Sequence, residues 1–231
     1  TENSNVAKNL IEQGVPEDNA AQIARSLSTY WGPQPNTSGT VYLGAIICFL
    51  FILGLVYLDT WHKWWIAVIT VFAIMLAWGG NFKAFNYFVF DYMPVYNKFR
   101  APTMALVIPQ LTAAVMAALV LQKFFFGGDA KELLFKKLKL SVYITAGVLA
   151  LTTLLYFSFN YSNQNDSRIK ENFANNMLSS LQGQQPTPQM QQQANEFGQS
   201  IVRSLADDRK GMFGGDLLRS ILFIIAAIVV L

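Results

Sequence analysis

The sequence contains little cysteine, histidine or charge. One cysteine, Cys48, and one histidine, His62, occur among 231 residues, which excludes a disulfide framework and a cysteine–histidine zinc site. Charged residues make up 13% of the chain, about half the share usual in soluble domains, which argues against a cytosolic globular protein. The net charge of +3 comes without a basic stripe, so nucleic-acid binding is not expected. The sequence also lacks a Gly-rich phosphate loop and a Gly-x-Ser-x-Gly motif, which leaves nucleotide binding and serine hydrolysis unsupported.

Apolar residues, by contrast, account for 53% of the chain, and the mean hydropathy is +0.31. They gather in segments long enough to cross a hydrocarbon layer of roughly 30 Å as helices. The sequence therefore predicts an all-α polytopic membrane protein with about five transmembrane helices. The predicted spans are residues 40–58, 61–78, 103–126 and 140–159, with the start of a fifth at 217–231.

The span predicted at 61–78 is short, and a buried helix of a soluble protein is the alternative for it. Tryptophans at both its ends favour the membrane, because Trp is enriched at membrane–water boundaries.

The sequence begins without methionine and ends inside the apolar run 221–231. We therefore expect the chain to be a segment of a longer polypeptide.

Lysines between the third and fourth predicted spans indicate the orientation in the membrane. They outnumber the acids there, which are Asp129 and Glu132. Loops rich in Lys and Arg stay in the cytoplasm, so this loop and the turn 59–63 are predicted inside. The lysines are Lys123, Lys131, Lys136, Lys137 and Lys139. The segments predicted outside are 1–39, 79–102 and 160–216.

Two of the outer segments have helical patterns. Residues 1–30 are expected to form a helical pair broken at Gly14. Residues 160–216 carry two amphipathic stripes separated by the Gln-rich stretch 182–193, which we interpret as a linker. We expect the run Asp207-Asp208-Arg209-Lys210 to be a solvated helix end.

The third outer segment is rich in aromatic residues. Seven rings occur within residues 82–96, a density that is costly to expose to water. One interpretation is an interfacial helix anchored by its rings. The alternative is a shallow trough in which the rings support the tail or the sugar of a lipid-linked substrate.

Lys98 and Arg100 follow this aromatic stretch and precede a predicted span. A guanidinium recognises phosphate through two parallel hydrogen bonds, so a lipid phosphate or pyrophosphate is a plausible ligand. The alternative is that Arg100 pairs with Asp91 or reaches ordinary lipid headgroups.

Four ordered blocks of the sequence resemble the bacterial YfhO-type membrane protein family, in particular its Bacteroidetes branch. The blocks are YWGPQPNTSG at 30–39 followed by VYLGAI at 41–46, MLAWGGNF at 75–82, DYMPVYNKFR at 91–100, and DDRK at 207–210 leading to DLLRS at 216–220. Members of this family are longer than this chain and have many transmembrane helices.

The resemblance implies a glycosyltransferase-C-like membrane fold in the bacterial cytoplasmic (inner) membrane. Such proteins transfer a sugar from a polyprenyl-phosphate carrier to a cell-envelope acceptor on the outer, periplasmic side. The partners implied are membrane lipids, the polyprenyl-phosphate-linked sugar and the remainder of a longer chain. The catalytic acid of this class usually lies in the first outer loop, so we expect it outside this segment.

The candidate site combines the two lines of inference. The candidate contacts to a lipid phosphate are Asp91, Asn97, Lys98 and Arg100, and the candidate stacking residues are Trp31, Tyr92, Tyr96 and Phe99. No motif indicates a cofactor, and none supports a divalent metal. The alternative function is a non-catalytic membrane scaffold or an accessory subunit that handles the lipid-linked substrate. Transport is less favoured, because the spans hold almost no ionisable side chains.

Overall fold

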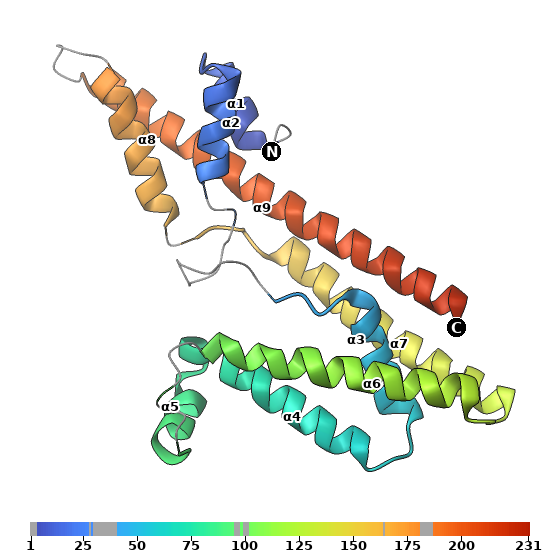
Figure 1. Cartoon of the computed structure of the whole chain (residues 1–231). Helices are drawn as coiled ribbons and strands as arrows, with labels where there is room; N and C mark the ends of the chain where they lie inside the picture. Colours follow the sequence, from blue (N-terminus) through green and yellow to red (C-terminus); the bar gives the residue numbers. More distant parts are fainter. Residues whose placement is uncertain are drawn as a thin grey trace. The chain divides into compact units, whose positions relative to one another are not determined.

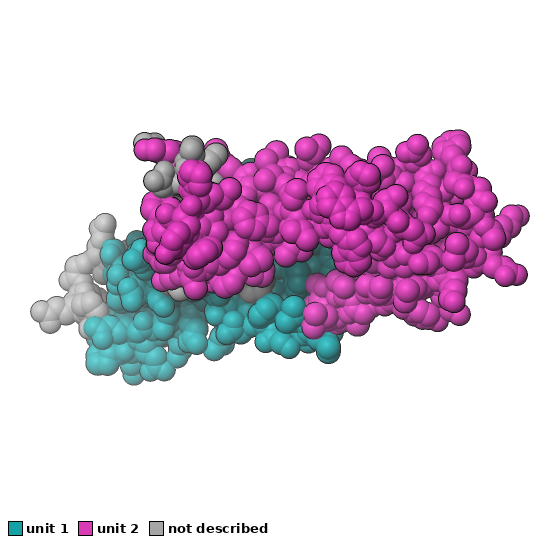
Figure 2. Space-filling model, turned by 90° about the horizontal axis from the view of Figure 1, so that it is seen from below, with its two compact units in different colours: residues 1–38, 153–218 teal, residues 39–152, 219–231 magenta. Residues whose placement is uncertain are grey.

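The computed structural model describes most of the chain as helices grouped in two compact units. Unit 1 consists of residues 1–38 and 153–218, and unit 2 of residues 39–152 and 219–231 (Figure 2). No strand occurs among the described residues. The described residues are 4–27, 29, 41–94, 98, 102–163, 165–180 and 187–231.

Three helical stretches are long and apolar enough to cross a membrane. They are Pro102–Phe126, Lys131–Ser158 and Pro188–Val230. A fourth candidate is the pair His62–Ala77 and Gly79–Tyr92, whose two parts are bent by 104°. The predicted all-α membrane architecture is thus confirmed at the level of helices, with three to four candidate spans in place of the five expected.

The span predicted at 40–58 is the main departure. Its helix α3 covers only Ala45–Tyr57, or 13 residues, which is about 20 Å long. The helix starts late because Gly44 has a φ of +94°, a left-handed conformation that ordinary helix residues do not adopt. It ends at Leu58, whose extended backbone leads into the turn.

Unit 2 is built around α6 (Val107–Phe126), which packs against both α3 and α4 (His62–Ala77) (Figure 1). The approach to α3 is close, because a Cβ added at Gly54 would lie 2.6 Å from Met116 Cγ. Small residues at such crossings let helices in a membrane approach each other. Thr70 and Thr112 join α4 to α6 through a buried hydrogen bond of 2.7 Å. The largest buried side chains of this core include Phe49, Leu53, Tyr57, Ile66, Met116 and Val120.

The lysine-rich segment is mostly helical, which corrects the prediction of a cationic loop. Helix α6 ends at Phe126 and α7 (Lys131–Ser158) begins only a few residues later. Lysine and glutamate are good helix formers, so four of the five lysines lie on the first turns of α7. The Lys123 ammonium lies 3.2 Å from the Asp59 carboxylate, so the α3–α4 turn and the α6–α7 turn lie at the same end of the helices, as the orientation argument requires.

Unit 1 is a cluster of amphipathic helices. Helix α1 (Asn5–Glu12) and α2 (Glu17–Ser26) form the predicted pair, joined through Gly14 with a φ of +87°. Their apolar faces pack with α8 (Asp166–Ser180) and with the first half of α9 (Pro188–Val230). The buried residues of this core are Val6, Leu10, Ala20, Ile201 and Leu205.

Helix α9 corrects two predicted boundaries. It begins at Pro188, so residues 188–193 of the predicted linker are helical, while 181–186 lie outside the described residues. Proline suits the first position of a helix, and the Thr187 hydroxyl accepts a hydrogen bond from the Met190 amide at 3.3 Å. The helix then continues without a break to Val230, so residues 217–231 are its apolar end and do not start a separate helix.

The run Asp207–Lys210 is likewise not a solvated helix end, because it lies in the middle of α9. Arg209 is buried and binds Asp166 through two hydrogen bonds, from Nη1 at 2.8 Å and Nη2 at 2.9 Å. Nη1 also donates to the Tyr161 carbonyl at 2.9 Å. Asp208 accepts hydrogen bonds from the Ser4 hydroxyl at 2.5 Å and the Asn5 amide at 2.7 Å, and so holds the start of α1.

The buried pair gives a test of unit 1. The side chains of Arg209 and Asp166 are only 1% and 7% exposed, so Arg209→Gln leaves a carboxylate without its counter-charge. Breaking a buried pair in this way costs about 3–5 kcal/mol, and we expect Arg209→Gln to lower the free energy of unfolding of unit 1 by that amount. Amide hydrogen exchange along α8 and the first half of α9 measures the loss.

The matched control is Arg203→Gln, which removes the same charge from an exposed position of the same helix. It is expected to change exchange little, because isolated surface charges contribute little to stability. If both variants increased the rate of amide exchange equally, a structural role for the Arg209–Asp166 pair would be contradicted.

Candidate functional site

The candidate site begins where α4 ends. Gly79 has a φ of +50°, and the short helix η1 (Gly79–Phe82) leads into α5 (Lys83–Tyr92), which turns away from the axis of α4 (Figure 1). Further along the sequence, the start of η3 lies beside the same glycine. A Cβ added at Gly79 would lie 3.5 Å from Pro102, the first residue of η3 (Pro102–Leu106). Gly79 and Pro102, the two ends of this segment, therefore lie close together.

One face of α5 packs back on α4. The Phe85 ring lies 5.7 Å from that of Phe72, edge to face, and stacks on Phe82 at 5.4 Å. The Asn86 amide donates to the Met75 and Phe82 carbonyl oxygens, at 3.2 Å each. The last carbonyls of a helix have no partner within it, so Asn86 satisfies one that the bend at Gly79 leaves open. This amide and the packed rings fix the direction of α5.

The other face of α5 carries exposed rings, which we call the aromatic shelf: Tyr87, Phe88, Phe90 and Tyr92. These side chains are between 49% and 76% exposed, and Phe88 lies 4.9 Å from Tyr92. Lys83 and Asp91 are exposed on the same helix. Rings mixed with charged side chains on a short helix are typical of the membrane–water boundary.

The structure places some of the predicted site residues and leaves others undescribed. Asp91 and Tyr92 lie together at the end of α5, both exposed, and Lys98 is also exposed. All three side chains are therefore accessible to solvent. The residues of the predicted site that lie outside the described part of the chain are Trp31, Tyr96, Asn97, Phe99 and Arg100.

A second polar group, which the sequence did not predict, lies at the other end of α4 and α6. We call Tyr57, Asp59, Lys123 and Asp129 the turn cluster. Tyr57 donates to Asp129 at 2.7 Å, and the Lys123 ammonium lies 4.8 Å from the centre of the Tyr57 ring. The hydrogen bond from Lys123 holds the pKa of the exposed Asp59 carboxyl below its usual range, so Asp59 is ionised at neutral pH.

No local pattern marks this cluster, because Tyr57 and Asp129 are separated by 72 positions and belong to no motif. Neither the aromatic shelf nor the turn cluster brings together side chains that could bind a metal ion. Within the described ranges, no group of three His, Cys, Asp or Glu side chains lies close enough to hold a metal ion. The exposed rings of the shelf offer stacking, and the lysines at both ends of unit 2 offer positive charge to an anion.

No family model, curated protein or solved structure matches this chain. The resemblance to the YfhO-type family thus stays a prediction from the four sequence blocks.

The role of Asn86 in fixing α5 is testable. Asn86→Ala removes the hydrogen bonds to the Met75 and Phe82 carbonyls, which are worth about 0.5–1.5 kcal/mol each. We expect backbone amides of residues 83–92 to exchange with solvent roughly tenfold faster in the purified protein in nanodiscs, since ~1.4 kcal/mol is a factor of ten. Asn81→Ala, at an exposed position of η1, is the control and should leave the exchange unchanged. Unchanged exchange in Asn86→Ala would show that the rings alone hold α5.

Proposed function

We propose that this chain is part of an integral membrane protein that transfers a sugar from a polyprenyl-phosphate carrier to a cell-envelope acceptor. The proposal includes membership of the YfhO-type family, a glycosyltransferase-C-like membrane domain and a place in the bacterial inner membrane. With the lysine-rich turn on the cytoplasmic side, residues 1–39, 79–102 and 160–216 would face the periplasm. The observation that carries the proposal is the aromatic shelf on α5, folded by 104° off the end of a membrane helix.

The position of the shelf suits a substrate that is part lipid and part sugar. A helix lying along the membrane surface contacts acyl or polyprenyl chains on one side and water on the other. Aromatic rings serve both parts, because they pack against apolar chains and against the C–H face of a sugar. Tyr87 and Tyr92 add hydroxyl groups that bind sugar hydroxyls.

The cationic residues beyond the shelf suit the phosphate of the carrier. In the proposed reaction the acceptor hydroxyl forms a bond to the anomeric carbon of the sugar, and the bond from that carbon to the carrier phosphate oxygen breaks. Negative charge builds up on the departing phosphate. Lys98 and Arg100 would stabilise that charge, Arg100 through paired hydrogen bonds. The base that takes the proton of the acceptor is expected outside this segment.

A second candidate function is a scaffold or accessory subunit that delivers the lipid-linked substrate to an enzyme. Unit 1 favours it, because its own apolar core and its buried Arg209–Asp166 pair give it a defined surface. A fixed helical surface outside the membrane is suited to holding a partner protein. If the purified full-length protein transfers the sugar without a partner, it is the enzyme and not an accessory subunit.

Lys98 and Arg100 provide the test in cells. Loss of a charge-assisted hydrogen bond costs about 1.5–3 kcal/mol, so Lys98→Ala and Arg100→Ala in the full-length protein should each lower envelope glycosylation by about tenfold or more. The readout is the glycan content of the envelope, with the amount of protein in the membrane measured alongside.

Lys131→Ala is the matched control, because Lys131 is an exposed lysine at the opposite end of the helices. It should leave glycosylation at the wild-type level. Normal glycosylation in both Lys98→Ala and Arg100→Ala would refute the assignment of a phosphate site beyond the shelf.

A further inference from the structure

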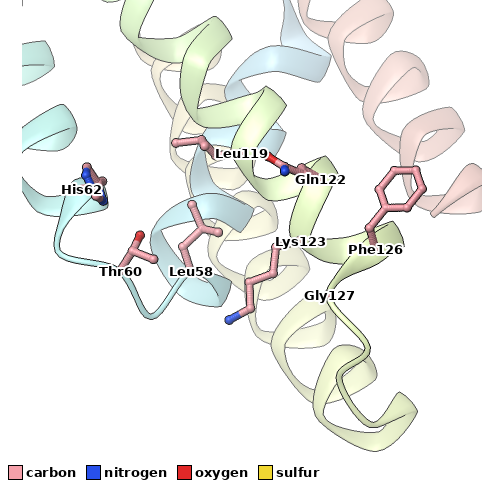
Figure 3. A pocket seen from close by; sticks show the side chains of 8 residues that line it. All are labelled: Leu58, Thr60, His62, Leu119, Gln122, Lys123, Phe126 and Gly127. Atoms are coloured by element: carbon pink, nitrogen blue, oxygen red, sulfur yellow. The ribbon is translucent and has the colours of Figure 1, made fainter.

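A cavity of about 390 Å³ lies beside the turn cluster, at the end of unit 2 opposite the aromatic shelf (Figure 3). It is formed between the α3–α4 turn and the last turns of α6. Its size is within the range of pockets that hold small ligands, roughly 300–1,000 Å³. The function proposed above makes no use of it.

The walls of the cavity are apolar on one side. Leu58 is buried and Leu119 lies on the facing surface of α6. At the rim, Phe126 is 85% exposed and is available to an acyl chain. An apolar wall that opens beside an exposed ring suits the glycerol end and the first methylene groups of a lipid.

The polar side of the cavity suits an anion. Lys123 extends from α6 toward the turn that carries Thr60, and Gln122 lies next to it on α6 (Figure 3). His62 completes the polar lining. These side chains offer an ammonium, an amide and a hydroxyl, all of which donate hydrogen bonds to phosphate oxygens.

Lys123 already has partners that a ligand must compete with. Its ammonium donates a hydrogen bond to Asp59 at 3.2 Å, forms a longer ion pair with Asp129 at 3.7 Å and lies 4.8 Å from the centre of the Tyr57 ring. A phosphate at this ammonium would take the place of the Asp59 carboxylate. The side chain of Asp59 is 69% exposed, and exposed ion pairs are weak enough for a phosphate to compete with them. Lys63 and Lys137 add positive charge nearby, and the ammonium of Lys137 lies 3.2 Å from the Val56 carbonyl.

The surroundings place the cavity at a membrane boundary. Three tryptophans lie at the end of the α3–α4 turn and the start of α4. Trp61 is 74% exposed, Trp64 61% and Trp65 37%. Tryptophan is enriched where hydrocarbon meets headgroups. Basic pockets between membrane helices at this level bind anionic lipid headgroups.

We propose that this cavity binds the phosphate headgroup of one anionic phospholipid, with Lys123 and Gln122 contacting the phosphate and Phe126 the acyl chain. The lipid joins the α3–α4 turn to the end of α6. The site is independent of the sugar transfer proposed above, because it lies at the opposite end of the helices and uses none of the same residues.

The experiment uses the purified protein in nanodiscs of phosphatidylcholine with and without phosphatidylglycerol. Native mass spectrometry after release from the discs measures the phosphatidylglycerol retained and its apparent Kd. Lys123→Gln should weaken retention by about tenfold, since losing a charge-assisted hydrogen bond is worth on that order. Lys123→Arg keeps the charge and should retain the lipid.

Two further variants guard against an effect on folding or on overall charge. Thr60→Trp fills the cavity from an exposed position and leaves Lys123 in place, so it should also lower retention. Lys136→Gln makes the same charge change at an exposed position of α7, outside the cavity, and should bind phosphatidylglycerol as the wild type does.

Inorganic phosphate added to the discs that contain phosphatidylglycerol distinguishes a lipid from a free anion. We expect it to compete poorly with phosphatidylglycerol, because it lacks the apolar part that the Leu58 and Leu119 walls contact. Competition at equal affinity would overturn the assignment to a lipid. Wild-type retention of phosphatidylglycerol by both Lys123→Gln and Thr60→Trp would overturn the site itself.

Discussion

The hydrocarbon layer of a membrane offers no partner to a backbone N–H or C=O, and this constraint organises the molecule. It accounts for the unbroken helix α7 and the apolar end of α9, in which the peptide groups away from the helix ends are satisfied within the helix. It also favours the membrane surface for the bend at Gly79, where the Asn86 side chain donates to the Met75 carbonyl near the end of α4 and to the Phe82 carbonyl of η1. The exposed rings of α5 agree with a position at the membrane surface, where aromatic side chains are enriched.

The same constraint gives unit 2 two chemically different ends. The end at Gly79 carries the aromatic shelf, with few charges among many rings. The other end carries Lys123, the lysines of α7 and the turn cluster. Each proposed ligand therefore uses a different end: the sugar and polyprenyl chain of the carrier would lie at the aromatic shelf, and the phospholipid headgroup at the turn cluster. Close packing of Gly54 against Met116 holds the helices between these ends together.

Hydrophobic patterns in the sequence predicted α4, α6, the apolar part of α7 and the α1–α2 pair, because helix periodicity and apolar length are local properties. They overestimated the segments 40–58 and 217–231, which are a 13-residue helix and the end of α9. They failed where a distant partner decides the structure. Arg209 is buried because Asp166, 43 positions earlier, lies opposite it, and nothing local marks that pairing. The Gln-rich stretch looked like a linker by composition, although glutamine is a good helix former. In the site, the sequence predicted the aromatic helix, whereas the turn cluster depends on contacts between separate helices.

The central claim is that the aromatic shelf and the turn cluster lie on opposite sides of the membrane, with the shelf outside. Cysteine labelling tests it most directly, in a background in which Cys48, the one cysteine of this sequence, and any further cysteine of the full-length protein are replaced by serine. A membrane-impermeant maleimide added to intact cells should label the full-length protein at Tyr92→Cys, and at Thr60→Cys only after the cells are permeabilised. Labelling of Thr60→Cys in intact cells, with Tyr92→Cys protected, would contradict the account.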